Sequence, residues 1–243
     1  FDPQRVVNLA AQPGVRYSKE NPYQYIQSNV VGFVNIIELC RHTKVDGFIY
    51  ASSSSVYGNN DIFPFSESDR INQPISLYGA TKASNELIAN SYSHLYGLNT
   101  TGLRFFTVYG SWYRPDMAIF IFTHKILNKQ KLPLYNQGSS HRDFTYIDDI
   151  VEGVFSAIQK NFKKEIFNLG NNKTERLIKV VKIIEDYVGV SAQIKHLPHQ
   201  KGDPYKTYAN IDHAKNYLNY KPKTTIEEGI PKFIDWYKDH YEI

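Results

Sequence analysis

The chain has 243 residues, 42% of them hydrophobic, which is enough for a substantial core in one domain or two closely packed lobes. Its one cysteine, Cys40, excludes an intramolecular disulfide framework and is typical of a reducing compartment, so we expect a cytoplasmic protein. The net charge of +4 is spread evenly and no apolar run approaches the length of a membrane span. We therefore expect neither a nucleic acid nor a membrane as partner.

Short apolar runs alternate with amphipathic segments in the first part of the chain. The run at 5–11 predicts a strand buried in a parallel sheet. The next apolar residues recur with the 4-3-4-3 spacing of one helix face: Ile26, Val30, Phe33, Ile37 and Cys40. The run at 48–51 predicts a second strand, which leads directly into the serines at 52–55.

The same alternation continues to the end of the chain. We predict a helix at 77–96 that ends at Gly97, with Leu87, Ile88, Tyr92 and Leu95 on its apolar side. A strand at 100–106, a helix at 148–160, a strand at 166–169 and a helix at 178–187 follow. The apolar face of a final helix is formed by Ile226, Ile230, Phe233, Ile234 and Tyr237. This order predicts an α/β fold with a parallel sheet and right-handed crossovers.

Tyr78 and Lys82 are the residues that point most directly to chemistry. Residues four apart lie on one face of a helix, about one turn from each other. A lysine ammonium beside a phenol favours the phenolate, which makes the tyrosine a usable base near neutral pH. Ser53, at the carboxyl end of the second strand, lies where parallel sheets bind ligands. The three residues together suit proton removal from an alcohol while hydride passes to a nicotinamide.

Each of these features also has an ordinary interpretation. The spacing Tyr-x-x-x-Lys occurs by chance in many helices. A run of serines after a strand is more often a solvated turn than a catalytic element. The order and the matching strand and helix contexts are what favour a catalytic interpretation.

The residues around this pattern resemble a known family over nearly the whole chain. The segments that carry the resemblance are Val-Asn-Leu-Ala-Ala-Gln-Pro-Gly-Val-Arg-Tyr-Ser at 7–18 and Arg-Asp-Phe-Thr-Tyr-Ile-Asp-Asp at 142–149. They are similar to the extended short-chain dehydrogenase/reductases that act on nucleotide sugars. Within that family the chain is most similar to UDP-glucuronate 4-epimerases, including those of capsule biosynthesis.

The resemblance implies a reaction and a set of site residues. Bound NAD would oxidise the sugar at C4, the 4-keto sugar would rotate, and hydride would return to its other face. Ser53, Tyr78 and Lys82 match the catalytic residues, and no metal is expected, because the eight histidines lack metal-ligand spacing. The residues expected to contact the cofactor are Leu9, Ala10, Ala11, Asn29, Tyr78 and Lys82. Those expected to contact the UDP-sugar are Gly14, Arg16, Ser54, Ser55, Thr107, Arg114, Arg142, Gln200 and Asp203.

Three positions bear on which member of the family the chain resembles. Ser54 and Ser55 stand where the related 4,6-dehydratases carry an Asp-Glu pair, and hydroxyls cannot do that acid–base work at neutral pH. Thr107 stands where UDP-galactose epimerases usually have asparagine. Arg114 offers a guanidinium that can bind a carboxylate with two parallel hydrogen bonds, which predicts a uronic acid substrate. The ordinary interpretation of Arg114 is a surface arginine in a turn.

The remaining candidates have ordinary interpretations of equal simplicity. Arg142 is expected on the nucleotide, or else in an ion pair with a nearby aspartate. Gln200 and Asp203 are expected on the uridine ribose, or else in a Gly-Asp-Pro turn. Asn29 is expected near the nicotinamide, or else on a helix surface. Asn168 is expected to line the nucleotide.

The chain departs from the family pattern at its start. It has no Gly-x-x-Gly-x-x-Gly turn, the element that receives the pyrophosphate of a dinucleotide. By comparison with the family, roughly 70 residues of the first half of the fold are missing, so we expect a fragment. We therefore predict an N-terminally truncated Rossmann-type sheet and a smaller C-terminal substrate lobe. Residues 1–243 alone are expected to bind NAD poorly.

The predicted organisation has two parts. Residues 1–110 and 146–170 are expected to form the partial NAD-binding domain, and 111–145 and 171–243 the nucleotide-sugar lobe. The resemblance implies a homodimer through the helices at 23–42 and 78–96. Three alternatives stay open: an epimerase for UDP-glucose or a UDP-N-acetylhexosamine, a decarboxylase of the same family, or an inactive fragment.

Overall fold

The computed structural model describes residues 2–200 and 203–242. The chain divides into two compact units, each formed by segments far apart in the sequence. The first unit consists of the residues up to Phe106, Glu152–Leu169 and Ala209–Tyr220. The second consists of Thr107–Val151, Gly170–Tyr208 and the residues from Lys221 onward.

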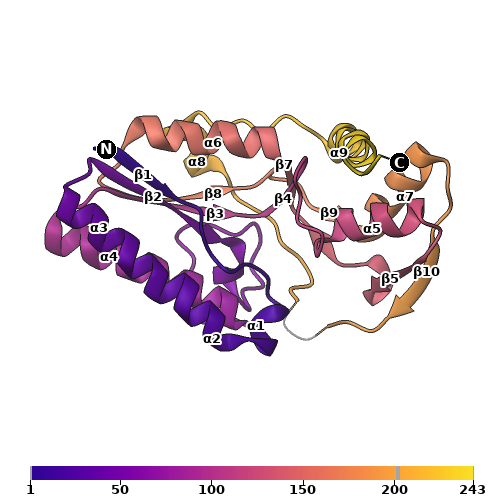
Figure 1. The fold of residues 1–243 in the computed structure, drawn as a ribbon, viewed down its shortest axis with the longest axis horizontal. Helices are drawn as coiled ribbons and strands as arrows, with labels where there is room; N and C mark the ends of the chain where they lie inside the picture. The colour runs from indigo at the N-terminus through magenta and orange to yellow at the C-terminus, as the bar shows by residue number, and fades with distance from the viewer. Residues whose placement is uncertain (1, 201–202, 243) are drawn as a thin grey trace. The chain divides into compact units, whose positions relative to one another are not determined.

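The first unit is built on a four-stranded parallel sheet in the order β1-β2-β3-β8. Its strands are β1 (Arg5–Asn8), β2 (Gly47–Ser53), β3 (Thr100–Phe105) and β8 (Lys164–Leu169). Its helices are α1 (Tyr17–Glu20), α2 (Pro22–Tyr25), the π-helix η1 (Ile26–Val31), α3 (Gly32–Thr43), the 3-10 helix η2 (Ser54–Tyr57), α4 (Leu77–Tyr96) and α8 (Asp212–Leu218). Helix α6 (Ile147–Lys160) begins in the second unit and continues into the first. Within the first unit, α3 and α4 cover one face of the sheet, and α6 and α8 cover the other (Figure 1).

The predicted parallel α/β fold is confirmed in this unit. The strands predicted at 48–51, 100–106 and 166–169 are β2, β3 and β8, and side chains at the centre of the sheet are fully buried. Helix α4 begins and ends where the sequence predicted. Gly97 closes it in the left-handed conformation, with φ 68°, which glycine adopts at little cost.

The apolar face predicted for 23–42 is correct only in its second half. Phe33, Ile37 and Cys40 are buried, but Ile26 is exposed. The reason is the π-helical turn Ile26–Val31, whose wider turn shifts the side chains out of the spacing of an α-helix. Tyr25 and Asn29 are buried in place of Ile26.

The apolar side predicted for α4 is also partly wrong. Leu87 and Leu95 are 64% and 66% exposed. The face that packs in the first unit is instead largely polar, and it includes Lys82, Asn85 and Glu86. These polar groups are buried because each finds a hydrogen-bond partner within the unit, which offsets the cost of removing it from water.

The second unit packs helices with short paired strands. Its helices are α5 (Ala118–Leu127), the 3-10 helix η3 (Asn136–Gly138), α7 (Leu177–Val188) and α9 (Ile226–Tyr241). Its strand pairs are β4 (Thr107–Tyr109) with β7 (Phe144–Tyr146), β5 (Lys131–Tyr135) with β10 (Gln193–Leu197), and β6 (His141–Arg142) with β9 (Glu175–Arg176). The predicted face of the last helix is confirmed, because all five of its apolar residues are buried in the core of this unit.

The boundary between the units differs from the predicted one. The segment 209–220, predicted in the C-terminal lobe, packs in the first unit, while 107–110 and 146–151 belong to the second. Helix α8 is held in the first unit by His213, whose ring stacks on Phe167 and whose Nε2 lies 2.9 Å from Glu165 Oε2. Leu218, on the same helix, is buried. These contacts join segments about 50 residues apart, which local periodicity does not reveal.

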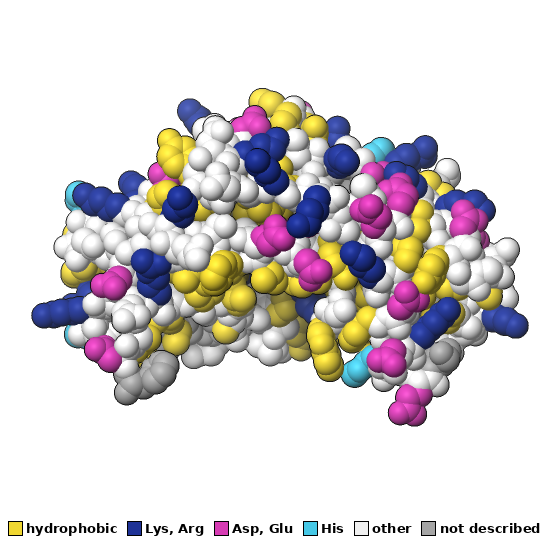
Figure 2. All heavy atoms as spheres, turned by 90° about the horizontal axis from the view of Figure 1, so that it is seen from above, with side chains coloured by type: hydrophobic (Ala, Val, Ile, Leu, Met, Phe, Trp, Pro, Cys, Tyr) yellow, Lys and Arg dark blue, Asp and Glu magenta, His cyan; other side chains and the backbone are white. Residues whose placement is uncertain are grey.

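Charges are mixed on the surface. On the face drawn in Figure 2, Lys and Arg side chains are scattered and interleaved with Asp and Glu. Within residues 2–200 and 203–242, no helix has the length and apolar character to span a membrane. The same residues contain no cluster of three or more His, Cys, Asp or Glu side chains able to hold a metal ion.

Candidate active site

Ser53 lies at the carboxyl end of β2, where the strand turns into the helix η2. Its backbone is extended, and its Oγ accepts a hydrogen bond from the N–H of Ser55 at 3.1 Å. This is an N-cap: the hydroxyl satisfies a donor of the first helical turn. The cap fixes the hydroxyl of Ser53 at the end of the strand and places Ser54 and Ser55 directly after it.

Helix α4 brings Lys82 to the same end of β2. The Nζ of Lys82 donates a hydrogen bond to the carbonyl oxygen of Ala51 at 2.8 Å, two residues before Ser53. The side chain is 4% exposed, and burial lowers the pKa of its ammonium from 10.5 to about 8. A buried amine with such a pKa is characteristic of functional sites. Lys82 therefore brings to the Ser53 loop a charge that is present at neutral pH and lost in mild alkali.

Tyr78 lies one turn before Lys82 on α4 and is half-buried. Its ring packs edge-on against the ring of Tyr25, with 6.3 Å between the centroids. Tyr25 is fully buried and its hydroxyl lies within 2.7 Å of the carbonyl oxygens of Pro13 and Gly14. The two tyrosines thus connect α4 with the loop that holds the predicted substrate residues Gly14 and Arg16.

A glycine lets α4 approach the serine loop. A Cβ atom added to Gly79 would lie 2.6 Å from the carbonyl oxygen of Ser55, a backbone atom that cannot move aside cheaply. Sequence reasoning missed this residue. Its signal was a glycine in the first turn of a helix, where alanine costs about 1 kcal/mol less. The missing side chain lets the first turn of α4 lie against the backbone of Ser55.

Adding one methyl group at Gly79 is expected to separate the two halves of the site. Gly79→Ala forces α4 away from Ser55, so we expect a loss of about 1–3 kcal/mol in the free energy of unfolding. We also expect turnover to fall by at least about tenfold, because the reacting groups are misplaced. Denaturant unfolding and steady-state kinetics measure the two effects. Gly32→Ala is the control, because the nearest atom to its added Cβ is at an ordinary 3.5 Å; equal effects in both variants would contradict the prediction.

The predicted cofactor residues surround the end of β1. Leu9 and Ala10 follow the strand and are exposed, and Ala11 is half-buried. Asn29 is buried rather than on a helix surface, and its side chain binds the N–H and the C=O of Gln12 and the hydroxyl of Thr81. It thereby ties the segment after β1 to η1 and α4. A direct contact between Asn29 and a nicotinamide stays a prediction.

This part of the first unit fits the nicotinamide cofactor that the sequence predicts. The exposed apolar residues Leu9 and Ala10 follow β1. The hydroxyl of Ser53 lies at the end of β2, and the buried ammonium of Lys82 reaches the same end of that strand from α4. Apolar surface suits the flat nicotinamide ring, while the polar pair suits the ribose hydroxyls and the reacting alcohol. In parallel sheets such ligands bind beyond the carboxyl ends of the strands, which is where these residues lie.

The predicted nucleotide residues gather in the second unit. Arg142 donates through Nη1 to the carbonyl oxygens of His141 at 2.8 Å and Tyr205 at 3.4 Å. The N–H of Asp203 donates to the carbonyl of Gln200. The Oε1 of Gln200 is buried and no donor among residues 2–200 and 203–242 bonds to it. An unsatisfied buried acceptor of this kind is unusual and suits a ligand donor.

An aromatic pair that the sequence did not single out accompanies these residues. The rings of His199 and Tyr205 stack face to face, with 4.0 Å between centroids and 9° between planes. The sequence contained an indication of this stacked pair, because His199 and Tyr205 flank the predicted ribose contacts Gln200 and Asp203. Thr107, in the same unit, donates its N–H to the carbonyl of Asp143 at 3.1 Å and begins β4.

Arg114 lies in an exposed turn and is bound to a carboxylate of its own chain. Its Nε and Nη2 donate to the two oxygens of Asp116 at 3.0 and 2.6 Å. This is the bidentate geometry that the sequence predicted toward a substrate carboxylate, here made with a neighbour two residues away. A substrate carboxylate that used the same edge of the guanidinium would take the place of Asp116.

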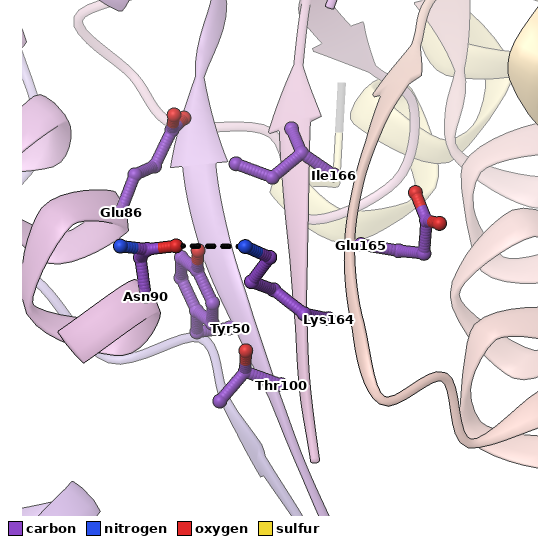
Figure 3. Close-up of a pocket in the computed structure, with 7 residues that line it drawn as sticks. All are labelled: Tyr50, Glu86, Asn90, Thr100, Lys164, Glu165 and Ile166. Atoms are coloured by element: carbon purple, nitrogen blue, oxygen red, sulfur yellow. Dashed lines mark hydrogen bonds between the residues drawn. The ribbon is translucent and has the colours of Figure 1, made fainter. Parts of the chain in front are cut away.

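A cavity of about 200 Å³ in the first unit lies away from these residues. It is lined from α4 by Glu86 and Asn90 and from the sheet by Tyr50, Thr100, Lys164, Glu165 and Ile166. Figure 3 shows Lys164 reaching toward Asn90, and the two bond at 3.1 Å. Thr100 and Lys164 begin β3 and β8, whereas Ser53 pairs with Phe105 at the other end of the sheet. The cavity is therefore not the predicted site.

Comparison with known proteins places the chain in a family. Residues 1–170 match the NAD dependent epimerase/dehydratase family. Protein CapI of Staphylococcus aureus is 52% identical over 99% of this chain and 77% of its own length. UDP-glucuronate 4-epimerase 3 of Arabidopsis thaliana is 47% identical over 97% of this chain and 59% of its own length. The crystal structure of UDP-glucuronic acid 4-epimerase from Bacillus cereus, in complex with UDP-glucuronic acid and NAD, matches with a TM-score of 0.94 and 34% identity, over 98% of this chain and 76% of that one.

These matches confirm the resemblance and the Rossmann-type fold predicted from the sequence. The chain is a member of the NAD dependent epimerase/dehydratase family.

Proposed function

We propose that the protein interconverts UDP-glucuronate and UDP-galacturonate by epimerisation at C4, with NAD as cofactor. The relatives named UDP-glucuronate 4-epimerase support the substrate, and the family supports the cofactor. We further propose that the product supplies a capsule or another surface polysaccharide, as the resemblance implies. The first unit would bind the cofactor and the second the nucleotide of the sugar.

The observation that carries the proposal is the position of Lys82. Its ammonium is buried at the end of β2 and bonds to Ala51, one helical turn from Tyr78 and two residues from Ser53. A structural lysine would reach solvent, since burying an ammonium costs free energy. A buried ammonium one helical turn from a tyrosine is instead suited to supporting a negatively charged oxygen during proton transfer.

The three side chains divide the work of the reaction. Tyr78 accepts the proton of the C4 hydroxyl and later returns it to the C4 oxygen. Ser53 holds that hydroxyl in place, and Lys82 stabilises the phenolate of Tyr78 by its charge. NAD, when bound, would supply the acceptor and donor of the C4 hydride. Rotation of the 4-keto sugar between oxidation and reduction would present the opposite face of C4 to that hydride, while Tyr78 returns the proton to the C4 oxygen.

The test is the conversion of UDP-glucuronate in the presence of NAD, followed by anion-exchange chromatography for UDP-galacturonate. This chain is assayed by itself and also joined to the part of Protein CapI that lies outside the matched 77% of that protein's length. We expect the active form, which is the form that binds NAD, to yield a mixture of both uronates. The proposal fails if the joined chain binds NAD and leaves UDP-glucuronate unchanged.

Arg114 provides a test of the substrate carboxylate. If the uronate displaces Asp116 from Arg114, the two substitutions have opposite effects. Arg114→Ala is expected to raise KM for UDP-glucuronate about tenfold, because a charged hydrogen-bonded pair is lost. Asp116→Asn is expected to lower that KM, because the competing charge is gone. Neither variant should change KM for UDP-glucose, and equal shifts for both sugars would show that Arg114 does not recognise the carboxylate.

A second candidate is the epimerisation of a neutral UDP-hexose. It is favoured by one observation: Asp116 already occupies the fork of Arg114, and a neutral sugar would leave that pair intact. Unchanged kinetics in both variants, with turnover of UDP-glucose, would select this candidate.

We also propose that the protein forms a homodimer through the helices at 23–42 and 78–96. The support is the exposure of apolar side chains there: Leu39 on α3 and Leu87, Leu95 and Tyr96 on α4. Arg41 of α3 lies over the ring of Tyr96 at 4.8 Å, so the two helices present one surface.

A charge placed on this surface is expected to separate the dimer. Leu87→Asp should shift the mass found by sedimentation equilibrium from two chains to one, because a buried unpaired carboxylate is costly. Phe155→Asp, on α6 at the other face of the sheet, is the control and should leave the mass unchanged (Figure 1). A parent protein that sediments as a monomer would contradict the proposal.

A further inference from the structure

A chain of buried polar side chains lies next to Ser53 within the first unit. Ser52 Oγ donates to Glu86 Oε1 at 2.5 Å, and Arg104 holds the same carboxylate through Nε at 3.0 Å and Nη2 at 2.8 Å. The Nη1 of Arg104 donates to the hydroxyl of Tyr57 at 2.9 Å, which in turn donates to Asn168 Oδ1 at 2.6 Å. These five residues are called the Ser52 network. The side chain of Asn168 is thus buried and hydrogen-bonded inside the unit, contrary to the prediction that it lines the nucleotide.

Stability alone does not account for the charged pair at the centre of the network. The side chains of Glu86 and Arg104 are each 3% exposed. Desolvation of two charges consumes most of the energy that their attraction returns, and apolar residues of similar volume often replace such pairs without loss. What a buried pair does offer is a fixed geometry, because moving either partner leaves a charge unpaired in the interior.

The network connects β2, α4 and η2, which carry the three predicted catalytic residues and the predicted substrate residues Ser54 and Ser55. Ser52 adjoins Ser53 in β2. Glu86 lies one turn beyond Lys82 on α4, the helix that also carries Tyr78. Tyr57 ends η2, the helix that Ser54 begins. Two separate hydrogen bonds therefore join α4 to the end of β2: Ser52 to Glu86, and Lys82 to the carbonyl oxygen of Ala51.

We propose that Glu86 is a positioning residue, which through Ser52 fixes Ser53 against Tyr78 and Lys82. This inference rests on the proposed function. Ser52 and Glu86 are both buried, so we expect them to act through Ser53 and α4 and to make no contact with a reactant of their own. Their bond sets the register between the end of β2 and α4, and with it the distance between the hydroxyl that holds the sugar and the phenol that takes its proton.

Two serine-to-alanine substitutions separate positioning from stability. Ser52→Ala removes the bond to Glu86. Ser93→Ala removes a comparable buried bond, from Ser93 Oγ to the carbonyl of Lys163 at 3.1 Å, near the far end of the same helix. The two serines are 2% and 6% exposed, so both variants lose one buried hydrogen bond and one hydroxyl. Similar losses in the free energy of unfolding are expected.

The kinetics of the two variants are expected to differ. In the active form of the protein, Ser52→Ala should lower kcat by roughly tenfold and leave KM within about twofold, because misplaced reacting groups slow the chemical step. Ser93→Ala should leave kcat unchanged. A double-mutant cycle with Glu86→Gln should show that the effect of Ser52→Ala is largely lost once Glu86 is changed. Equal kcat values in the two alanine variants, or additive effects in the cycle, would overturn the proposal.

A second measurement does not depend on activity. The N–H of Ser55 bonds to Ser53 Oγ, so its hydrogen exchange reports the position of that hydroxyl. Exchange at Ser55 should be faster in Ser52→Ala than in the parent chain and unchanged in Ser93→Ala. This holds even if the parent protein does not epimerise UDP-glucuronate, so the two proposals can fail separately. It also serves if Glu86→Gln does not fold, and equal exchange in all three proteins would contradict the positioning role.

Discussion

Replacing Tyr78 with phenylalanine is expected to abolish epimerisation while leaving the fold intact. The substitution removes one oxygen, the predicted acceptor of the proton from the C4 hydroxyl. The ring keeps its edge-on contact with Tyr25, at 6.3 Å between centroids, so packing against α2 is retained. Loss of a general base lowers turnover by about 100- to 10,000-fold. Conversion of UDP-glucuronate by the active form of the protein measures the effect, and thermal unfolding measures the stability.

The matched control for this variant is Tyr25→Phe. It removes a hydroxyl of the same kind from the ring that contacts Tyr78, and it loses the bonds to Pro13 and Gly14. We expect a clear loss of stability, since two partly buried carbonyls lose the one O–H donor that they share, and a much smaller loss of turnover. If Tyr78→Phe kept more than a tenth of the parent activity, Tyr78 would not be the base.

Replacing Lys82 with methionine is expected to change activity and stability in opposite directions. Methionine has a similar length, fills the same buried space and carries no charge. Turnover should fall by at least about 100-fold, because the phenolate loses its charged neighbour. Stability at pH 7 should hold or rise, because folding no longer buries an ammonium, although the bond to Ala51 is lost.

The lowered pKa of Lys82 predicts that the stability of the parent protein rises with pH. Burial lowers the pKa of Lys82 from 10.5 to about 8, so between these values the unfolded chain binds a proton that the folded chain does not. The stability of the parent protein contains a penalty below pH 8 that disappears as the pH rises to 10.5. The shift corresponds to about 3 kcal/mol. The stability of Lys82→Met relative to the parent should therefore decrease by about that amount between pH 7 and 10.5.

The activity of the parent protein should fall as the pH rises. The ammonium that supports Tyr78 is present below a pH of about 8 and is lost above it, so turnover of the parent protein is expected to fall there. Chemical denaturation at several pH values and a pH–rate profile supply the two curves. Lys164→Met, which changes an exposed lysine at the start of β8, is the control and should follow the parent in both. A difference in stability that stays constant from pH 7 to 10.5 would show that Lys82 is not desolvated.

The sequence by itself was sufficient where local pattern decides the outcome. Hydrophobic runs predicted β2, β3 and β8, the spacing of apolar residues predicted the buried face of α9, and Gly97 marked the end of α4. These features depend on periodicity and on the conformational range of single residues, both of which are properties of neighbours along the chain. The spacing of Tyr78 and Lys82 belongs to the same class.

The sequence was insufficient where distant segments decide which face of a helix is buried. A π-helical turn exchanged Ile26 for Asn29 at the buried positions, and bonds to β2 and β3 made the polar side of α4 its inner face. The short strand pairs of the second unit were not predicted either. They are two to five residues long, too short for alternation to distinguish from loops.

The candidate site shows the same division. Residue types and spacing predicted Ser53, Tyr78 and Lys82 as the catalytic residues. Only the tertiary structure decided that Gly79 approaches the backbone of Ser55 and that Asp116 pairs with the guanidinium of Arg114. It likewise decided that Asn168 is buried. It also revealed the Ser52 network, whose bonds join residues 34, 18, 47 and 111 positions apart. The physical reason is that a hydrogen bond or a close contact depends on which elements meet in space, and the order of residues along one element does not determine which element lies opposite.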